Sequence, residues 1–298
     1  GPSNQHKFVF FTSNVFCISL KNQEFNRWQR MLKRSNHFQL PISKYDACTF
    51  NLNTEVTNTM NTLNAPRSVH SIQCTDSSQP ITSSHTITDV FTPGMKPGEL
   101  GCAQSHINLW RRIIQQNLPY ALILEDDVQF RTDWLEQLSI CSVPQDDPEW
   151  HGLFLNIMGS MPPPYHTWAR IGPQCCTGAY ILSARGAQWL LANFGKESNF
   201  TGTTTGSNHE DEHRTENSTA NSTESSIESS IELLYPFTVA DWMTMEMHKQ
   251  GHSYSMFPWL VKQEYQDSTI RPIPEMLGNL YYSNTLLRDA EYSFTNYI

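Results

Sequence analysis

The sequence predicts an α/β fold built around an open, mainly parallel central sheet. Short runs of apolar residues alternate along the chain with segments whose apolar residues recur at helical spacing. This alternation is typical of α/β domains. With 298 residues the chain is also long enough to bury a substantial core within one domain.

The first half of the chain contains the clearest elements. Residues 15–20 have the pattern of a buried first strand, and the polar, basic stretch 22–35 is expected to be helical in part. Apolar residues at helical spacing predict an amphipathic helix over 99–116. Residues 120–124 form a short continuous apolar run, which is typical of a central strand buried on both faces.

The second half continues the alternation after a segment, 51–92, that is rich in Asn, Thr and Ser and receives no assigned element. Ser183 is a suitable N-cap for the helix that follows it. The expected elements are strands at 150–157 and 179–182, helices through 186–193 and 239–250, and a strand at 253–261.

Residues 196–232 differ from the rest in composition and charge. They carry eight acidic and two basic residues, so six of the nine net negative charges of the chain lie there. Large apolar residues are scarce, and burial cannot offset the entropy cost of ordering such a segment. We expect a disordered acidic insertion within a single domain that spans residues 3–298, Gly1 and Pro2 being typical of a cleaved tag.

Composition narrows the classes of function. The acidic balance makes nucleic acid an unexpected partner, and no stretch reaches the roughly 18 to 20 apolar residues of a membrane span.

The seven cysteines are scattered and contain no CxxC pair, so neither a zinc motif nor a disulfide scaffold is predicted. Cys17 and Cys102 are expected to be core residues rather than ligands. Sequons at Asn199, Asn217 and Asn221 indicate the lumen of the secretory pathway (Golgi or ER) for a eukaryotic protein, with the cytoplasm as the alternative.

The acidic triplet Glu125-Asp126-Asp127 follows directly after the predicted strand 120–124. Ligands of open α/β sheets bind beyond the carboxyl ends of strands. Three neighbouring carboxylates repel one another unless water or a cation neutralises them, and hard oxygen ligands suit Mg²⁺ or Mn²⁺. The alternative interpretation is a solvated turn before the next helix.

Several short blocks follow one another along the chain in a fixed order. They are Cys17-Ile18-Ser19-Leu20 with Arg27 and Arg30, Tyr45-Asp46-Ala47, residues 97–106 (PGELGCAQSH) with Trp110, 121–127 (ALILEDD), 177–183 (TGAYILS) with Gly186-Ala187, 239–242 (VADW) and 258–264. With these ordered blocks the sequence resembles glycosyltransferase family 25, which includes lipooligosaccharide galactosyltransferases and procollagen galactosyltransferases. One departure is Lys21, which stands where the family usually has Asp.

This resemblance implies a GT-A-type fold and a metal-dependent, inverting transfer from a UDP-sugar, most often UDP-galactose. The acceptor would be a hydroxyl on a glycan or glycoprotein. Asp127 and Glu125 would hold Mn²⁺ or Mg²⁺, which stabilises the charge that develops on the departing diphosphate. The residues implied to contact the donor are Arg27, Ser105, His106, Glu125, Asp126 and Gly178.

Asp241 is the candidate general base. Transfer with inversion needs a carboxylate opposite the leaving group to accept the acceptor's proton. The alternative is an acid that interacts favourably with the N-terminal end of the helix dipole. Gln263 and Glu264 are further candidates for donor or acceptor contact, and Tyr180 and Trp242 either stack on sugar rings or pack in the core. The rival function is a catalytically inactive protein that binds a sugar nucleotide or glycan.

Overall fold

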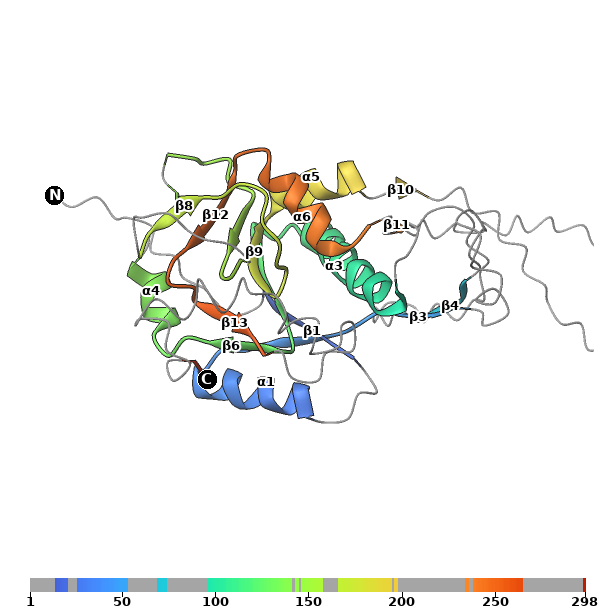
Figure 1. Cartoon of the computed structure of the whole chain (residues 1–298), viewed down its shortest axis with the longest axis horizontal. Helices are drawn as coiled ribbons and strands as arrows, with labels where there is room; N and C mark the ends of the chain where they lie inside the picture. Colours follow the sequence, from blue (N-terminus) through green and yellow to red (C-terminus); the bar gives the residue numbers. More distant parts are fainter. Residues whose placement is uncertain are drawn as a thin grey trace, which may run out of the picture.

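A mixed sheet of seven strands forms the centre of the part of the chain that the structure describes (Figure 1). The computed structural model describes residues 14–20, 26–52, 69–73, 96–140, 143–144, 146–157, 166–194, 196–197, 234–235, 238–264 and 297–298. The strand order is β2-β1-β5-β9-β7-β12-β8. These strands are β1 (Val15–Ser19), β2 (Ser43–Asp46), β5 (Tyr120–Glu125), β7 (Gly152–Phe154), β8 (Trp168–Arg170), β9 (Ala179–Ser183) and β12 (Ser253–Met256).

Five of these seven strands run in one direction, and β8 and β9 run against them. β1 is parallel to β2 and β5, and β12 is parallel to β7. β9 is antiparallel to both of its neighbours, β5 and β7, and β8 is antiparallel to β12. The predicted α/β class is therefore confirmed. The sheet is mixed, because β9 lies between β5 and β7 and runs opposite to both, but most of its strands share one direction as predicted.

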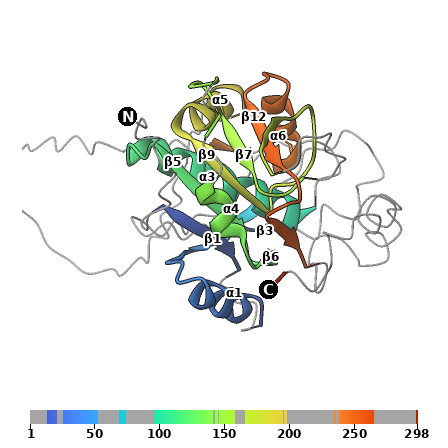
Figure 2. The ribbon, with the colours of Figure 1, turned by 90° about the vertical axis from the view of Figure 1, so that its left-hand side faces the viewer.

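Helices cover both faces of the sheet. α3 (Pro97–Gln115), α5 (Ala184–Phe194) and α6 (Ala240–His248) pack against one another on one face. α1 (Asn26–His37) lies on the other side of β1 from α3 (Figure 2). A short helix, α4 (Trp134–Ile140), packs within the core cluster on the α1 side of the sheet.

The alternation of side chains along β5 explains why its apolar run is continuous. Ala121 and Ile123 belong to the core cluster that contains the α3 residues Ile107 and Trp110, whereas Leu122 and Leu124 belong to the cluster on the opposite face. All four strand residues are at most 1% exposed. Both faces of β5 are thus buried, as the sequence predicts for a central strand.

Three small two-stranded sheets complete the described elements. β3 (Thr49–Leu52) pairs with β4 (Val69–Gln73), β6 (Val128–Phe130) with β13 (Val261–Gln263), and β10 (Lys196–Glu197) with β11 (Leu234–Tyr235). The strand expected at 253–261 is therefore two strands, β12 and β13, in two different sheets. The first two residues of the predicted acidic insertion form β10, and residues 198–232 lie outside the described residues together with the three sequons.

Local signals account for several element boundaries. The hydroxyl of Ser183 accepts a hydrogen bond from the Gly186 backbone N–H at 3.0 Å, so Ser183 caps α5 as predicted. At the start of α3, Glu99 accepts a hydrogen bond from the backbone N–H of Lys96 at 2.9 Å. Pro97 occupies the first turn, where a missing N–H costs nothing. None of the described helices is long and apolar enough to cross a membrane.

Candidate functional site

The acidic triplet lies at the edge of the sheet where β1 and β5 end. These two strands are parallel, so Ser19 at the end of β1 and Glu125 at the end of β5 reach the same edge. β9 runs in the opposite direction, and the loop that precedes it therefore brings Thr177 and Gly178 to this edge as well. The Glu125 backbone N–H donates to the Gly178 carbonyl at 2.8 Å. The topology thus gathers three separate segments around the triplet.

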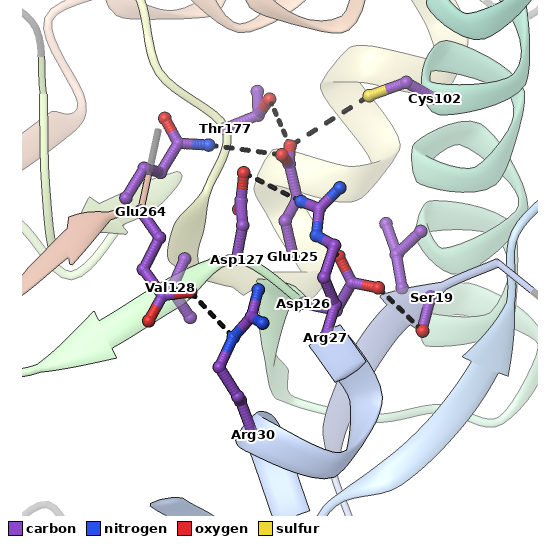
Figure 3. A network of polar contacts seen from close by, with 12 residues as sticks. Ser19, Arg27, Arg30, Cys102, Glu125, Asp126, Asp127, Val128, Thr177 and Glu264 are labelled. Carbon is purple, nitrogen blue, oxygen red and sulfur yellow. Dashed lines mark hydrogen bonds and ion pairs between the residues drawn. The ribbon is translucent and has the colours of Figure 1, made fainter. Parts of the chain in front are cut away.

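Arg27 bridges the second and third acids of the triplet (Figure 3). Its Nε lies 3.0 Å from Oδ1 of Asp126, and its Nη2 lies 2.9 Å from Oδ2 of Asp127. The Ser19 hydroxyl donates to the other oxygen of Asp126 at 2.7 Å. Arg27 extends from the first turn of α1, so this helix contributes positive charge to the site.

Glu125 accepts hydrogen bonds from several elements. Its Oε1 lies 3.0 Å from the Thr177 hydroxyl and 3.3 Å from His106 Nε2. The thiol of Cys102 is 4.0 Å from the same oxygen. Oε2 accepts from the Gln263 amide at 3.2 Å. Glu125 is therefore held in place by α3, by the loop before β9 and by β13.

The electrostatics of the triplet favour a bound cation. Three carboxylates face one guanidinium, so two negative charges are left uncompensated when all four groups are ionised. Burial raises the pKa of Asp127 to about 7, and the negative charge of Glu125 adds to this shift while Arg27 opposes it. Burial also raises the pKa of Asp126, again against the effect of Arg27. Burial acts in the same direction on Glu125, but His106, the Thr177 hydrogen bond and the charge of Arg27 together outweigh it, so the pKa of Glu125 is lowered.

The residues present fit a divalent metal ion with oxygen ligands. Oδ1 of Asp127 is buried and accepts no well-aligned hydrogen bond from a described residue, although the Gln263 side chain is close enough to influence this carboxylate. A divalent cation would supply positive charge to neutralise the negative charges of Asp127 and Glu125. Hard carboxylate oxygens match Mn²⁺ and Mg²⁺.

Asp241 lies in the first turn of α6 and is brought to the same site by Thr177. The Thr177 hydroxyl is 3.3 Å from Oδ1 of Asp241 and 3.0 Å from Oε1 of Glu125. Since one hydroxyl carries one proton, it donates to one carboxylate at a time, and both carboxylates lie within its reach. The neighbouring Trp242 is 60% exposed, whereas Tyr180 is fully buried. Trp242 therefore presents an exposed aromatic ring on α6, one residue after the candidate base, and Tyr180 packs in the core.

The predicted donor-contact residues occupy different positions. Gly178 lies beside Gln263, and a Cβ at Gly178 would come within 2.9 Å of that side chain. Ser105 and His106 are fully buried. The Ser105 hydroxyl donates to the Gly101 carbonyl at 2.7 Å and accepts from the Cys48 N–H at 2.8 Å. His106 contacts the site directly through Glu125, while Ser105 reaches it only through the packing of α3.

Arg30 does not join the triplet in the described structure. It forms an ion pair with Glu264 at 3.0 Å, and Arg34 pairs with the same carboxylate and donates to the Val128 carbonyl at 3.0 Å. Gln129 donates to Glu264 at 3.1 Å. This network fixes α1 against β6 and β13, and so holds Arg27 in position at the triplet.

Sequence reasoning missed the roles of Ser19, Cys102 and Thr177. Each lies inside a recognised block, but no local pattern indicates which side chain of a block will face Glu125 or Asp126.

Cys17 is fully buried in the core as predicted. Cys102 is half-buried instead, with its thiol directed to Glu125. Cys17, Cys102, Cys175 and Cys176 are free thiols, and Cys48 takes part in a disulfide.

Comparison with known proteins defines the class. Residues 12–156, just under half of the chain, match the family model described as glycosyltransferase family 25 (LPS biosynthesis protein). The matched segment contains β1, α1, α3, β5 and the entire acidic triplet. This segment therefore resembles glycosyltransferase family 25, the family that the ordered blocks also resemble.

Individual relatives agree with this family. The chain is 30% identical over 103 residues to "Procollagen galactosyltransferase 1" of Danio rerio, across 32% of this chain and 17% of that protein. It is 34% identical over 106 residues to a "Putative glycosyltransferase" of Haemophilus influenzae, across 33% of this chain and 36% of that protein. A bovine relative, 27% identical over 112 residues (32% of this chain and 18% of that protein), is named "Probable inactive glycosyltransferase 25 family member 3". The matches thus span about a sixth to a third of these relatives.

Proposed function

We propose that the chain transfers a sugar, with galactose as the leading candidate, from a UDP-sugar to a hydroxyl of a glycan or glycoprotein acceptor. The reaction would depend on Mn²⁺ or Mg²⁺ and proceed with inversion on a GT-A-type fold. The observation that carries this proposal is the acidic triplet at the carboxyl end of β5, beside the end of the parallel strand β1. Asp126 is buried, Glu125 and Asp127 are partly buried, and a further carboxylate, Asp241, lies close by.

Each residue then has a definite task. Asp127 and Glu125 would hold the cation, which when bound stabilises negative charge on the departing diphosphate. Arg27 holds Asp126 and Asp127 in place and can turn toward a phosphate once a cation neutralises them. Asp126, which is held by the Ser19 hydroxyl, would contact the nucleoside of the donor. His106 would orient Glu125.

Asp241 would remove the proton from the acceptor hydroxyl. Its carboxylate lies next to the triplet but belongs to α6 rather than to the strand end, so it approaches the site from a separate element. Thr177 limits the freedom of this carboxylate. The exposed ring of Trp242 stands next to it, where an acceptor sugar could stack.

The test of this proposal is Asp127→Asn, with Asp133→Asn as the matched control. Asp133 lies six residues along the chain, pairs with Arg131 at 2.7 Å and does not contact the triplet. We expect Asp127→Asn to lower transfer from UDP-galactose by about 100-fold or more, because a charged ligand is lost from the cation. Asp133→Asn should remain near wild type. Wild-type turnover of Asp127→Asn, or full activity after metal removal with EDTA, would refute the assignment.

A second candidate is a catalytically inactive protein that binds a sugar nucleotide or a glycan. The bovine relative favours this candidate, because its name describes it as a probable inactive glycosyltransferase. Hydrolysis of UDP-sugars, measured with and without Mn²⁺, separates the two candidates. Metal-dependent hydrolysis supports the transferase, whereas a thermal shift with UDP-sugars and no turnover of any donor supports the binding protein.

A further inference from the structure

A thiol, an imidazole and a carboxylate converge on one side of the acidic triplet. Cys102 and His106 are separated by one turn of α3, and Glu125 ends β5 opposite them. The ligand atoms of the three residues all lie within 4.8 Å of one another. His106 Nε2 is 3.3 Å and Cys102 Sγ is 4.0 Å from Oε1 of Glu125. These side chains point toward a common centre, and of the three only the Cys102 thiol has no task in the proposed transfer reaction.

The distances are close to those of a tetrahedral zinc site. With Zn–S of about 2.3 Å and Zn–N or Zn–O of about 2.0–2.1 Å, neighbouring ligand atoms are separated by roughly 3.3–3.6 Å. The His106–Glu125 separation already matches this range, and the Cys102–Glu125 separation exceeds it by a few tenths of an ångström. One sulfur, one nitrogen and one oxygen ligand suit Zn²⁺, whereas Mg²⁺ and Mn²⁺ prefer oxygen.

A second layer of hydrogen bonds orients the imidazole. His106 Nδ1 lies 2.8 Å from the hydroxyl of Tyr180, which also accepts from Trp110 Nε1 at 2.9 Å. The Tyr180 hydroxyl can donate to Nδ1 or accept from it. It can therefore stabilise the tautomer with hydrogen on Nδ1, which leaves the Nε2 lone pair free for a metal. Metal-binding histidines typically have such an outer partner on the other ring nitrogen.

We propose that Cys102, His106 and Glu125 form a binding site for Zn²⁺ that is distinct in its ligand chemistry from the oxygen site at Asp127. On binding, the Cys102 S–H bond breaks, a sulfur–zinc bond forms and the proton is released to solvent. The hydrogen that His106 Nε2 directs at Glu125 in the metal-free site leaves Nε2, and the ring keeps one hydrogen on Nδ1, which donates to the Tyr180 hydroxyl. Three protein ligands leave a fourth position for water. Glu125 is common to both sites, so zinc would withdraw it from the proposed catalytic cation; this consequence alone rests on the proposed function.

The test uses Co²⁺ as a spectroscopic substitute for Zn²⁺ in the full chain, after removal of metal with EDTA and dialysis. We expect one equivalent of Co²⁺ to give an intense near-ultraviolet thiolate-to-cobalt band and the visible bands of tetrahedral cobalt, and Zn²⁺ to abolish both. In Cys102→Ser the near-ultraviolet band should be lost. Zinc affinity should fall by about 100-fold or more, since even outer-layer changes cost 10–100-fold. The matched control Cys175→Ser, another half-buried free thiol, should behave like the wild type.

Absence of the band in the wild type, or its persistence in Cys102→Ser, would overturn the proposal. A second measurement on the wild type avoids any dependence on folding of the variant. Zn²⁺ should slow alkylation of Cys102 by iodoacetamide by about tenfold or more, because a metal-bound thiolate is protected, while Cys175 is alkylated at an unchanged rate. Equal rates at Cys102 with and without Zn²⁺ would also refute it. Neither readout involves sugar transfer, so failure here leaves the proposed transferase activity untouched.

Discussion

The variant Asp241→Asn distinguishes two possible roles of Asp241, a general base in catalysis and an acid that stabilises the start of α6. Asn keeps the size of the side chain and an oxygen that can accept from Thr177, which lies 3.3 Å from Oδ1 of Asp241. It removes the negative charge and the capacity to take up a proton. The fold and the contacts at the site are therefore expected to survive, and only proton transfer should be affected.

The expected magnitudes differ for the two roles. Loss of a general base lowers the rate by about 10²- to 10⁴-fold, and 10²-fold corresponds to about 2.7 kcal/mol of activation free energy. Loss of a charge near the start of α6 should cost only about 0.3–1 kcal/mol of stability, as expected for a partly exposed acid near a helix N-terminus. The first effect is seen in turnover and the second in thermal unfolding.

The assay compares Asp241→Asn with Glu246→Gln, which removes the same charge from the same helix. Glu246 is paired with Lys249 on the surface and, among the described residues, forms no ion pair with the triplet. Turnover with UDP-galactose and an acceptor glycan, UDP-galactose affinity by calorimetry and Mn²⁺ binding should be measured on both variants. We expect Asp241→Asn to lose turnover with donor affinity unchanged, and Glu246→Gln to retain both. A near-normal rate would remove Asp241 from the mechanism, and a collapse of donor affinity would make it a donor ligand instead.

Three further predictions address the surroundings of the site. Gly178→Ala should weaken donor affinity several-fold and lower thermal stability, because the new Cβ would displace Gln263 from Glu125. Calorimetry that finds an unchanged donor affinity would contradict this expectation. Replacement of residues 198–232 by a short Gly/Ser linker should leave the melting temperature and donor affinity nearly unchanged, since few apolar residues there are available for burial, and a variant that fails to fold would show the opposite. In metal-free protein the folded state favours protonated Asp127, because the folded pKa of about 7 exceeds the unfolded value. The contribution of Asp127 to the free energy of unfolding should therefore be fully present below about pH 4 and be lost as the pH rises through about 7. The melting temperature of the wild type relative to Asp127→Asn should therefore fall over this interval in EDTA, and a constant difference would refute the raised pKa.

The sequence by itself determined most of the local structure and indicated where along the chain the candidate site lies. The continuous apolar run of β5 indicates a strand buried on both faces, and helical spacing of apolar residues indicates α3. Both are local patterns that burial imposes on neighbouring residues. Ser183 as the cap of α5 follows from an equally local hydrogen bond. The acidic triplet was identified as a candidate because three adjacent carboxylates after an apolar strand repel one another unless water or a cation neutralises them.

Only the tertiary structure decided which residues meet. The antiparallel insertion of β9 between β5 and β7 brings Thr177 to Glu125, and no pattern within residues 177–183 indicates the direction of that strand. Likewise, the packing of α3 directs Cys102 toward Glu125 instead of into the core. Strand direction and helix rotation result from burial summed over the whole sheet, in which contacts join residues far apart in the chain. Local periodicity fixes which face of an element is buried, but it carries no information about the element against which that face will pack.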